Sequence, residues 1–187
     1  MDITSTISRI ERELHATFDE VERWFEIESD VLDYKPLTGG WSVAQILEHI
    51  VLTSHFLLIL IDKGAAKALK NTNGLDLKEE LENYQFDLEG IEDIGVTKSF
   101  SWIRPEHMEP TGSRALSDIR GELNTQRQRI VEHLRRLSNG EGILYKTTMS
   151  VNNLGKIDVY QYIYFLIKHA QRHVQQMENN RTEHQES

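Results

Sequence analysis

The sequence predicts an all-α fold, a four-helix bundle with a long crossover. Apolar residues recur at spacings of three and four positions in four long stretches, which is the period of an amphipathic helix. Cap signals precede two of these stretches, and the segment between the second and the third carries two prolines and no period. Four long helices with an extended connection are typical of bundles, whose inward positions hold metals and cofactors.

The first predicted helix covers roughly residues 3–31. Its apolar positions are separated by charged residues and comprise Ile3, Ile7, Ile10, Leu14, Val21, Trp24 and Val31. We expect this element to end before the Lys35-Pro36 pair, because the residue before a proline disfavours helical geometry.

The second predicted helix begins in the stretch TGGWSVAQILEHI. Two glycines supply a turn, Ser42 is placed to cap the helix, and Gln45 stands where a capping box requires it. The helix covers roughly residues 43–63 or 43–70, and the NTNG sequence at 71–74 indicates a turn. Because it is apolar on nearly every face, we expect this helix to be central in the fold.

The remainder of the chain predicts a connecting excursion and two further helices. Residues 75–112 form the excursion, a third helix covers roughly 114–137, and residues 138–140 stop it. After a stretch of turn and β-branched residues, Asp158 caps the last helix. Its apolar side comprises Val159, Tyr162, Ile163, Leu166, Ala170, Val174 and Met177. We expect one domain over residues 1–179 and a flexible tail at 180–187.

Composition excludes several classes of function. The 21 basic and 30 acidic residues give a net charge of −9, which argues against a nucleic-acid partner. The first residues do not form a secretory signal, and the longest apolar run, 50–61, is shorter than the ~20 residues that cross a bilayer. We therefore expect a soluble cytoplasmic protein with no membrane partner. The absence of cysteine leaves nitrogen and oxygen as metal ligands.

Two histidines occupy one face of the last predicted helix. His169 and His173 are four positions apart, so their Cβ atoms lie about 6 Å from each other on a helix. Catalytic zinc sites commonly use three protein ligands and leave one position open. The best third candidate is His49, which lies about two turns into the buried second helix.

The alternative interpretation is that these are hydrogen-bonded core histidines. Eight histidines make an i,i+4 pair unremarkable by chance, and a single histidine on an apolar helix is more often a core residue than a ligand. Several inward imidazoles, however, each need a polar partner, and one metal ion satisfies three of them at once.

The other five histidines are weaker candidates. The patterns place four of them at the surface, at the rim or in the tail, namely His15, His55, His133 and His184. His107 approaches the site only if the excursion folds over it. By helical spacing, the candidates for contacting the ligand histidines are Gln45, Thr53, Tyr162 and Gln176. No general base is identifiable, and the catalytic residues stay unknown.

Several features together resemble the DinB-like, or YfiT-like, family of four-helix metalloproteins. They are Trp41-Ser42 at the start of the second helix, His49, the sequence PEHMEPTG at 105–112, and HAQRHVQQ at 169–176. The resemblance covers about residues 7–179 and is loose over 75–104. It implies that His49, His169 and His173 bind one divalent metal ion, which in that family is often zinc or nickel.

The resemblance also implies an activity. Better-understood members look like thiol S-transferases that use bacillithiol, mycothiol or glutathione, including a mycothiol-dependent maleylpyruvate isomerase, and others look like metal-dependent hydrolases. Many look like homodimers. We therefore expect a metal-dependent transferase or hydrolase acting on a small-molecule substrate, with a low-molecular-weight thiol as a cosubstrate. The alternative is a non-catalytic helical protein that binds a small ligand, with a structural metal or none.

Overall fold

Four long helices form the body of the protein, as the sequence predicts. The computed structural model describes residues 2–37, 39–87, 90–96 and 105–187. The long helices are α1 (Ile3–Arg23), α3 (Val43–Asn71), α5 (Leu116–Arg136) and α6 (Val159–Glu186). Each helix contacts two others, since α1 and α3 both pack against α5 and α6. This arrangement is the four-helix bundle that the apolar periods indicate.

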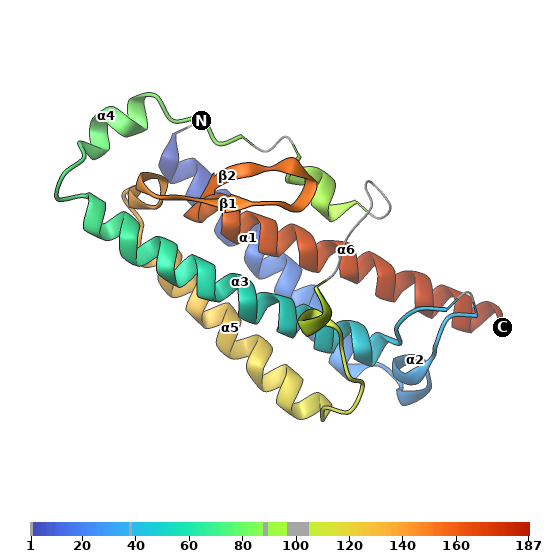
Figure 1. Ribbon diagram of the computed structural model, residues 1–187. Helices are drawn as coiled ribbons and strands as arrows, with labels where there is room; N and C mark the ends of the chain where they lie inside the picture. Colours follow the sequence, from blue (N-terminus) through green and yellow to red (C-terminus); the bar gives the residue numbers. More distant parts are fainter. Residues whose placement is uncertain (1, 38, 88–89, 97–104) are drawn as a thin grey trace.

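The direction of the helices explains the long crossover. In Figure 1, α3 and α5 run in the same direction, opposite to α1 and α6. The chain must therefore return along the length of the bundle between α3 and α5. This connection contains α4 (Leu77–Glu82) and two 3₁₀ helices, η2 (Glu92–Gly95) and η3 (Glu106–Met108). Part of the crossover, residues 88–89 and 97–104, lies outside the described residues.

The first helix ends earlier than its apolar period predicts. After α1 the chain forms the 3₁₀ helix η1 (Trp24–Glu26), passes through an extended Ile27, and forms α2 (Ser29–Asp33). The single helix expected over 3–31 is therefore wrong beyond Arg23. The buried residues continue across this break, so periodicity alone could not reveal it.

Both predicted helix caps are confirmed, and the capping box expected at Ser42 has an unexpected counterpart at Asp158. The Ser42 side chain accepts from the backbone N–H of Gln45, whose own side chain accepts from the backbone N–H of Ser42. Asp158 and Gln161 make the same reciprocal pair at the start of α6. Each pair satisfies two backbone N–H groups that a helix terminus otherwise leaves without partners.

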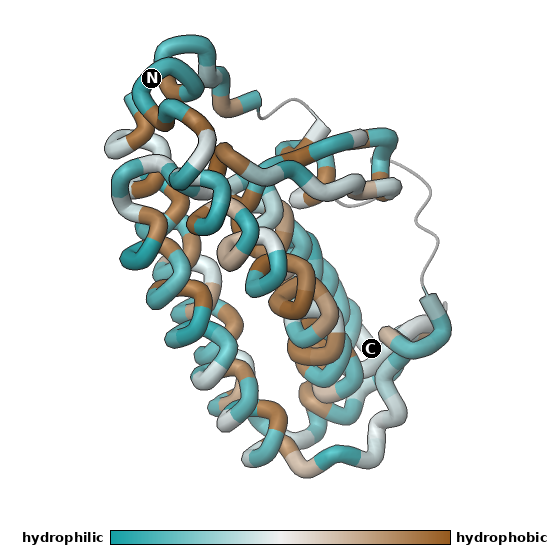
Figure 2. The backbone as a smooth tube through the Cα atoms, turned by 60° about the vertical axis from the view of Figure 1, so that its left-hand side comes forward, coloured by the Kyte–Doolittle hydropathy of each residue, from teal (hydrophilic) through white to brown (hydrophobic). Residues whose placement is uncertain are grey.

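The core is built around α3 and α6. Figure 2 shows hydrophobic positions recurring along the long helices. Among the described residues, α3 is the one helix long and apolar enough to span a membrane. Since most of its apolar part is buried inside the bundle, its composition is that of a core helix.

A small hairpin precedes α6 and is absent from our sequence-based expectations. After the 3₁₀ helix η4 (Glu141–Leu144), strand β1 (Lys146–Met149) pairs with β2 (Gly155–Asp158) in antiparallel register, with the 3₁₀ helix η5 (Val151–Asn153) between them. Asn152 and Asn153 both have positive φ, which asparagine tolerates better than most residues. The hairpin leads directly into the Asp158 cap of α6.

The last helix continues through the segment that was expected to be a tail. Residues 180–186 are helical, so the flexible tail predicted at 180–187 is corrected. Asn180 is buried and donates to the backbone oxygen of Trp41, and Glu183 accepts from the Tyr34 hydroxyl and from the backbone N–H of Leu37. These contacts hold the final turns of α6 against the chain that enters α3.

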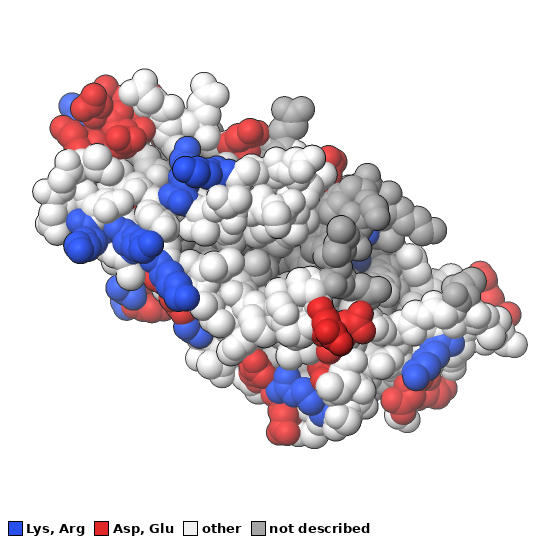
Figure 3. Space-filling view, viewed as in Figure 1, with Lys and Arg blue, Asp and Glu red and all other residues white. Residues whose placement is uncertain are grey.

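Charged side chains are grouped at the end of the bundle that carries α4. On the face shown in Figure 3, an acidic group lies over α4 and a row of basic side chains lies along the neighbouring end of α3. The exposed residues concerned are Glu79, Glu80 and Glu82 on α4, and Lys63, Lys67 and Lys70 on α3. Spacings of three and four residues place these lysines on one helical face.

Candidate metal centre

The three predicted histidines come together between α3 and α6. Each offers a ring nitrogen, and these nitrogens all lie within 4.8 Å of one another. The ring centroid of His49 lies 5.2 Å from that of His169 and 4.7 Å from that of His173, and the Nε2 atoms of His169 and His173 are 3.1 Å apart. The rings thus converge on one point, and all three residues are at least 93% buried.

The environment favours neutral imidazoles. Burial lowers the pKa of His169 well below its ordinary value of 6.5, and repulsion from His173 and His49 lowers it further. At neutral pH the ring therefore carries no charge and keeps a nitrogen lone pair, which is the form that binds a metal.

Hydrogen bonds on the far side of two rings direct their Nε2 atoms to the common point. His49 Nδ1 lies 2.7 Å from the backbone oxygen of Met108, and His173 Nδ1 lies 3.0 Å from Oε1 of Gln176. Both partners are acceptors, so each Nδ1 carries the proton and donates it. In the neutral ring Nε2 then holds the lone pair. Such partners fix the tautomer and orientation of metal-binding histidines.

The donor set fits a divalent metal ion. Three uncharged imidazoles are a common ligand set for zinc and nickel, and three protein ligands leave coordination positions for water or substrate. The Trp41 ring packs 4.6 Å from the His49 ring and 6.5 Å from the His173 ring, measured between centroids. The Trp41 ring thus packs against two of the three rings and restricts their rotation.

Of the four residues predicted to contact the histidines, two do so and two have other partners. Gln176 contacts His173, and Thr53 Oγ1 lies 3.4 Å from His49 Nε2. Gln45 instead completes the α3 capping box, and the Tyr162 hydroxyl donates to the backbone oxygen of Thr148. The Met108 carbonyl is the contact that sequence reasoning missed, since every residue has a carbonyl and no side-chain signal marks it.

The remaining histidines lie outside this centre. His55 is exposed, as expected, and the ring of His107 packs on Phe56 with a centroid distance of 4.4 Å. His133 was expected at the surface or rim, but it is 6% exposed and its Nε2 lies 2.6 Å from Asp62 Oδ1. The reason is its position on the side of α5 that packs against α3.

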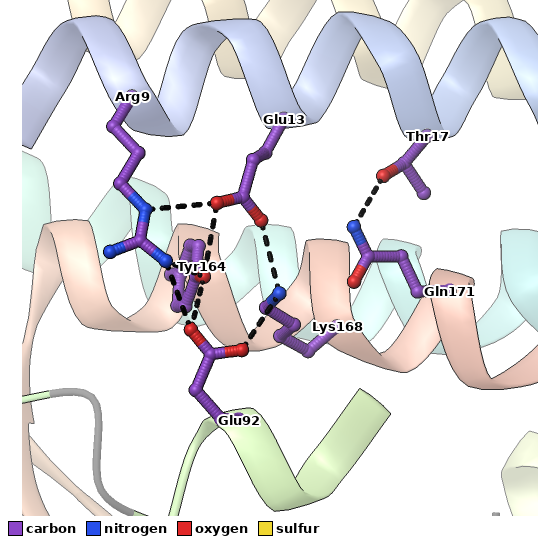
Figure 4. A network of polar contacts seen from close by, with 7 residues as sticks. All are labelled: Arg9, Glu13, Thr17, Glu92, Tyr164, Lys168 and Gln171. Atoms are coloured by element: carbon purple, nitrogen blue, oxygen red, sulfur yellow. Dashed lines mark hydrogen bonds and ion pairs between the residues drawn. The ribbon is translucent and has the colours of Figure 1, made fainter. Parts of the chain in front are cut away.

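Lys168, the residue before His169, belongs to an ion-pair network. Figure 4 shows Lys168 between Glu13 of α1 and Glu92 of η2, with Tyr164 beside them. The Lys168 Nζ atom is 3.0 Å from Glu13 Oε2 and 2.9 Å from Glu92 Oε2. Arg9 contacts both carboxylates on the other side. The network therefore joins α1, α6 and the crossover close to the centre.

The network keeps its members charged. Burial opposes the charged form of Lys168, but hydrogen bonds to Glu92, Tyr164 and Glu13 outweigh it and raise the pKa of Lys168. Burial likewise opposes ionisation of Glu13, yet hydrogen bonds from Arg9 and Lys168 lower the pKa of that carboxyl. Each charge thus depends on its partners, as expected for ion pairs with limited solvent access.

The fold and the three-histidine cluster together define a helical-bundle protein with a candidate metal centre. The family model of the DinB superfamily matches residues 11–177, a range that includes all three histidines. The chain belongs to the DinB superfamily. No curated protein and no solved structure matches the chain.

Proposed function

We propose that the protein is a metal-dependent enzyme, a thiol S-transferase or a hydrolase, with His49, His169 and His173 as metal ligands. The single observation that carries this proposal is the convergence of three buried imidazoles, with ligand nitrogens within 4.8 Å of one another. One divalent ion placed between the rings would bind all three imidazoles at once. Zinc and nickel are the metals that suit the donor set.

The residues around the centre prepare it for such chemistry. A divalent ion held there would lower the pKa of a bound water or thiol and so supply a nucleophile near neutral pH. The Met108 carbonyl and Gln176 orient two of the imidazoles, and burial keeps His169 uncharged. Because the chain has no cysteine, a thiol nucleophile has to arrive as a small-molecule cosubstrate.

The setting of this activity is also a proposal. The acidic net charge of −9 supports a small-molecule substrate rather than nucleic acid. The burial of α3 within the bundle supports a cytoplasmic protein without a membrane partner. Homodimerisation rests on the family resemblance, and light scattering on the purified protein tests it.

The metal site is tested by metal content. Purified protein loaded with zinc should hold one ion per chain, and the His169→Ala and His49→Ala variants should lose it. His55→Ala is the matched control, because His55 lies on the same helix as His49 but is exposed. Unchanged stoichiometry in the two ligand variants would refute the assignment.

The activity is tested separately from the site. Conjugation of the electrophile monochlorobimane should be measured with bacillithiol, mycothiol and glutathione, and hydrolysis with simple esters and amides, each with and without zinc or nickel. The proposal expects turnover that requires metal and is lost in His169→Ala. A protein that binds metal but shows no metal-dependent turnover would instead be a ligand-binding protein.

A further inference from the structure

Two neighbouring residues of α3 hold the same segment of the crossover. His49 Nδ1 donates a hydrogen bond to the Met108 backbone oxygen at a distance of 2.7 Å. The preceding residue, Glu48, accepts from the Thr111 hydroxyl at 2.9 Å and from the Gly112 backbone N–H at 2.7 Å. The segment from residue 108 to residue 112 is therefore attached to α3 at both of its ends.

The buried carboxylate of Glu48 forms one end of this attachment. It is 1% exposed, and an ionisable group this deeply buried is costly unless its oxygens are hydrogen-bonded. Each carboxylate oxygen accepts one of the two hydrogen bonds, and both donors belong to the crossover. Within the described part of the chain, no basic side chain forms an ion pair with Glu48. The partners of Glu48 thus lie in the segment that carries the Met108 carbonyl.

The backbone at the attachment point is shaped for close approach. Gly112 has a φ of +70°, which L side chains rarely adopt, and a Cβ there would meet the Gln45 side chain at 3.1 Å. Gln45 belongs to the capping box that begins α3. The segment therefore sits directly on the first turns of the helix that presents His49.

The position of the Met108 oxygen decides which nitrogen of His49 is available. A backbone carbonyl can only accept, so His49 has to carry its proton on Nδ1, and the lone pair is at Nε2. If the segment moved away, this preference would be lost and the ring would be free to rotate or to exchange tautomers. The Glu48 contacts oppose such movement at the other end of the segment.

We propose that Glu48 is a positioning residue for the metal centre. Through Thr111 and Gly112 it holds the crossover so that the Met108 carbonyl fixes the tautomer and orientation of His49. The inference deepens the proposed function and rests on it for its consequence, which is metal affinity. Glu48 itself contacts the crossover rather than the ion.

Two variants weaken the attachment by different routes. Thr111→Val removes one donor and preserves the side-chain shape. Glu48→Gln replaces one of the two acceptor oxygens by an amide NH₂. With the remaining oxygen on the Gly112 N–H, the Thr111 hydroxyl has to accept instead of donate, and both hydrogen bonds lose the negative charge that strengthens them. Glu109→Gln is the matched control, because Glu109 is an exposed glutamate in the same segment. Thermal denaturation of each variant checks that it is folded.

Two measurements test the inference. Nitrogen-15 NMR of the metal-free protein should show His49 protonated at Nδ1 in the wild type, and a mixture of tautomers in Thr111→Val and Glu48→Gln. Zinc affinity, measured by competition with a chelator, should fall about ten- to hundred-fold in both variants and stay unchanged in the control. Unchanged tautomer and affinity in folded variants would overturn the inference, as would an Nε2-protonated His49 in the wild type.

These measurements distinguish a failure of the positioning role from a failure of the proposed function. If the wild type bound no zinc, the proposed function would fail, whereas the NMR comparison would still decide whether Glu48 positions His49. If the wild type bound zinc and the folded variants bound it equally well, the positioning role alone would be refuted.

Discussion

The Nε2 atoms of His169 and His173 lie 3.1 Å apart on successive turns of α6. His173 donates its Nδ1 proton to Gln176, so its Nε2 accepts, and the proton between the two Nε2 atoms belongs to His169. For both Nε2 atoms to bind one ion, His169 would have to carry its proton on Nδ1 instead, so that each of the two facing nitrogens offers a lone pair.

Gln176 should support metal binding through His173. Its Oε1 atom, 3.0 Å from His173 Nδ1, fixes the tautomer with Nε2 available. Gln176→Leu removes this acceptor and should lower zinc affinity by roughly ten-fold. Gln175→Leu is the control, because Gln175 is exposed and contacts Asn179 instead. Equal affinities of the two variants, measured by chelator competition, would contradict the role assigned to Gln176.

The network around Lys168 should contribute to stability. Lys168→Met leaves Glu13 and Glu92 without one of their cations, and we expect the free energy of unfolding to fall by about 1–3 kcal/mol. The figure is below the cost of breaking a fully buried pair because Glu92 is 45% exposed. Arg135→Met, at an exposed ion pair with Glu132, should cost less than about 0.5 kcal/mol. Similar losses in urea denaturation would mean that the network adds nothing beyond a surface pair.

Asp158 should make the stability depend on pH. Burial raises the pKa of this carboxyl from 3.8 to about 6, against the opposing hydrogen bonds from Gln161 and Tyr84. The folded protein therefore holds the proton more tightly than the unfolded chain, and the contribution of Asp158 to stability falls as the pH rises from about 4 to about 6.

Asp158→Asn isolates this effect. Asparagine keeps the helix cap but does not titrate. The stability of the wild type relative to the variant should decrease by about 2 kcal/mol between pH 4 and pH 7. Urea denaturation at both values measures it, and a constant difference would show that Asp158 titrates as in the unfolded chain.

Gly142 should tolerate no side chain. A Cβ at this position would lie 2.7 Å from the ring of Tyr160, which is fully buried. Gly142→Ala should therefore destabilise the protein by about 1–3 kcal/mol through overpacking. Gly121→Ala is the opposite case, since Gly121 is exposed in the second turn of α5 and nothing lies within 4 Å of its Cβ position. This substitution should stabilise the protein by about 0.5–1 kcal/mol. Thermal melting of both variants measures the two shifts in melting temperature. Shifts of the same sign would contradict the packing argument.

Much of the fold was predictable because its signals are local. The capping residues Ser42 and Asp158 mark helix starts through side chains that only a few residue types offer. The break after Arg23 was not predictable, because buried residues continue at helical spacing on both sides of it. The hairpin at 146–158 was missed since its four-residue strands show no clean alternation between buried and exposed positions.

The candidate centre was predictable in its histidines but not in their surroundings. The spacing of His169 and His173 places them on one face, and the apolar neighbours of His49 direct it inward. The contacts of Met108 and Glu48 span about sixty residues of sequence and depend on how the crossover folds back. No local pattern encodes such a contact, and it had to come from the three-dimensional arrangement.

The central claim is that the three imidazoles share one metal ion, and crystals of zinc-loaded protein test it most directly. An anomalous-difference map at the zinc absorption edge should show one peak about 2.1 Å from a nitrogen of each of His49, His169 and His173. A map with no peak between these rings, or with its only peak elsewhere on the protein, would contradict the claim.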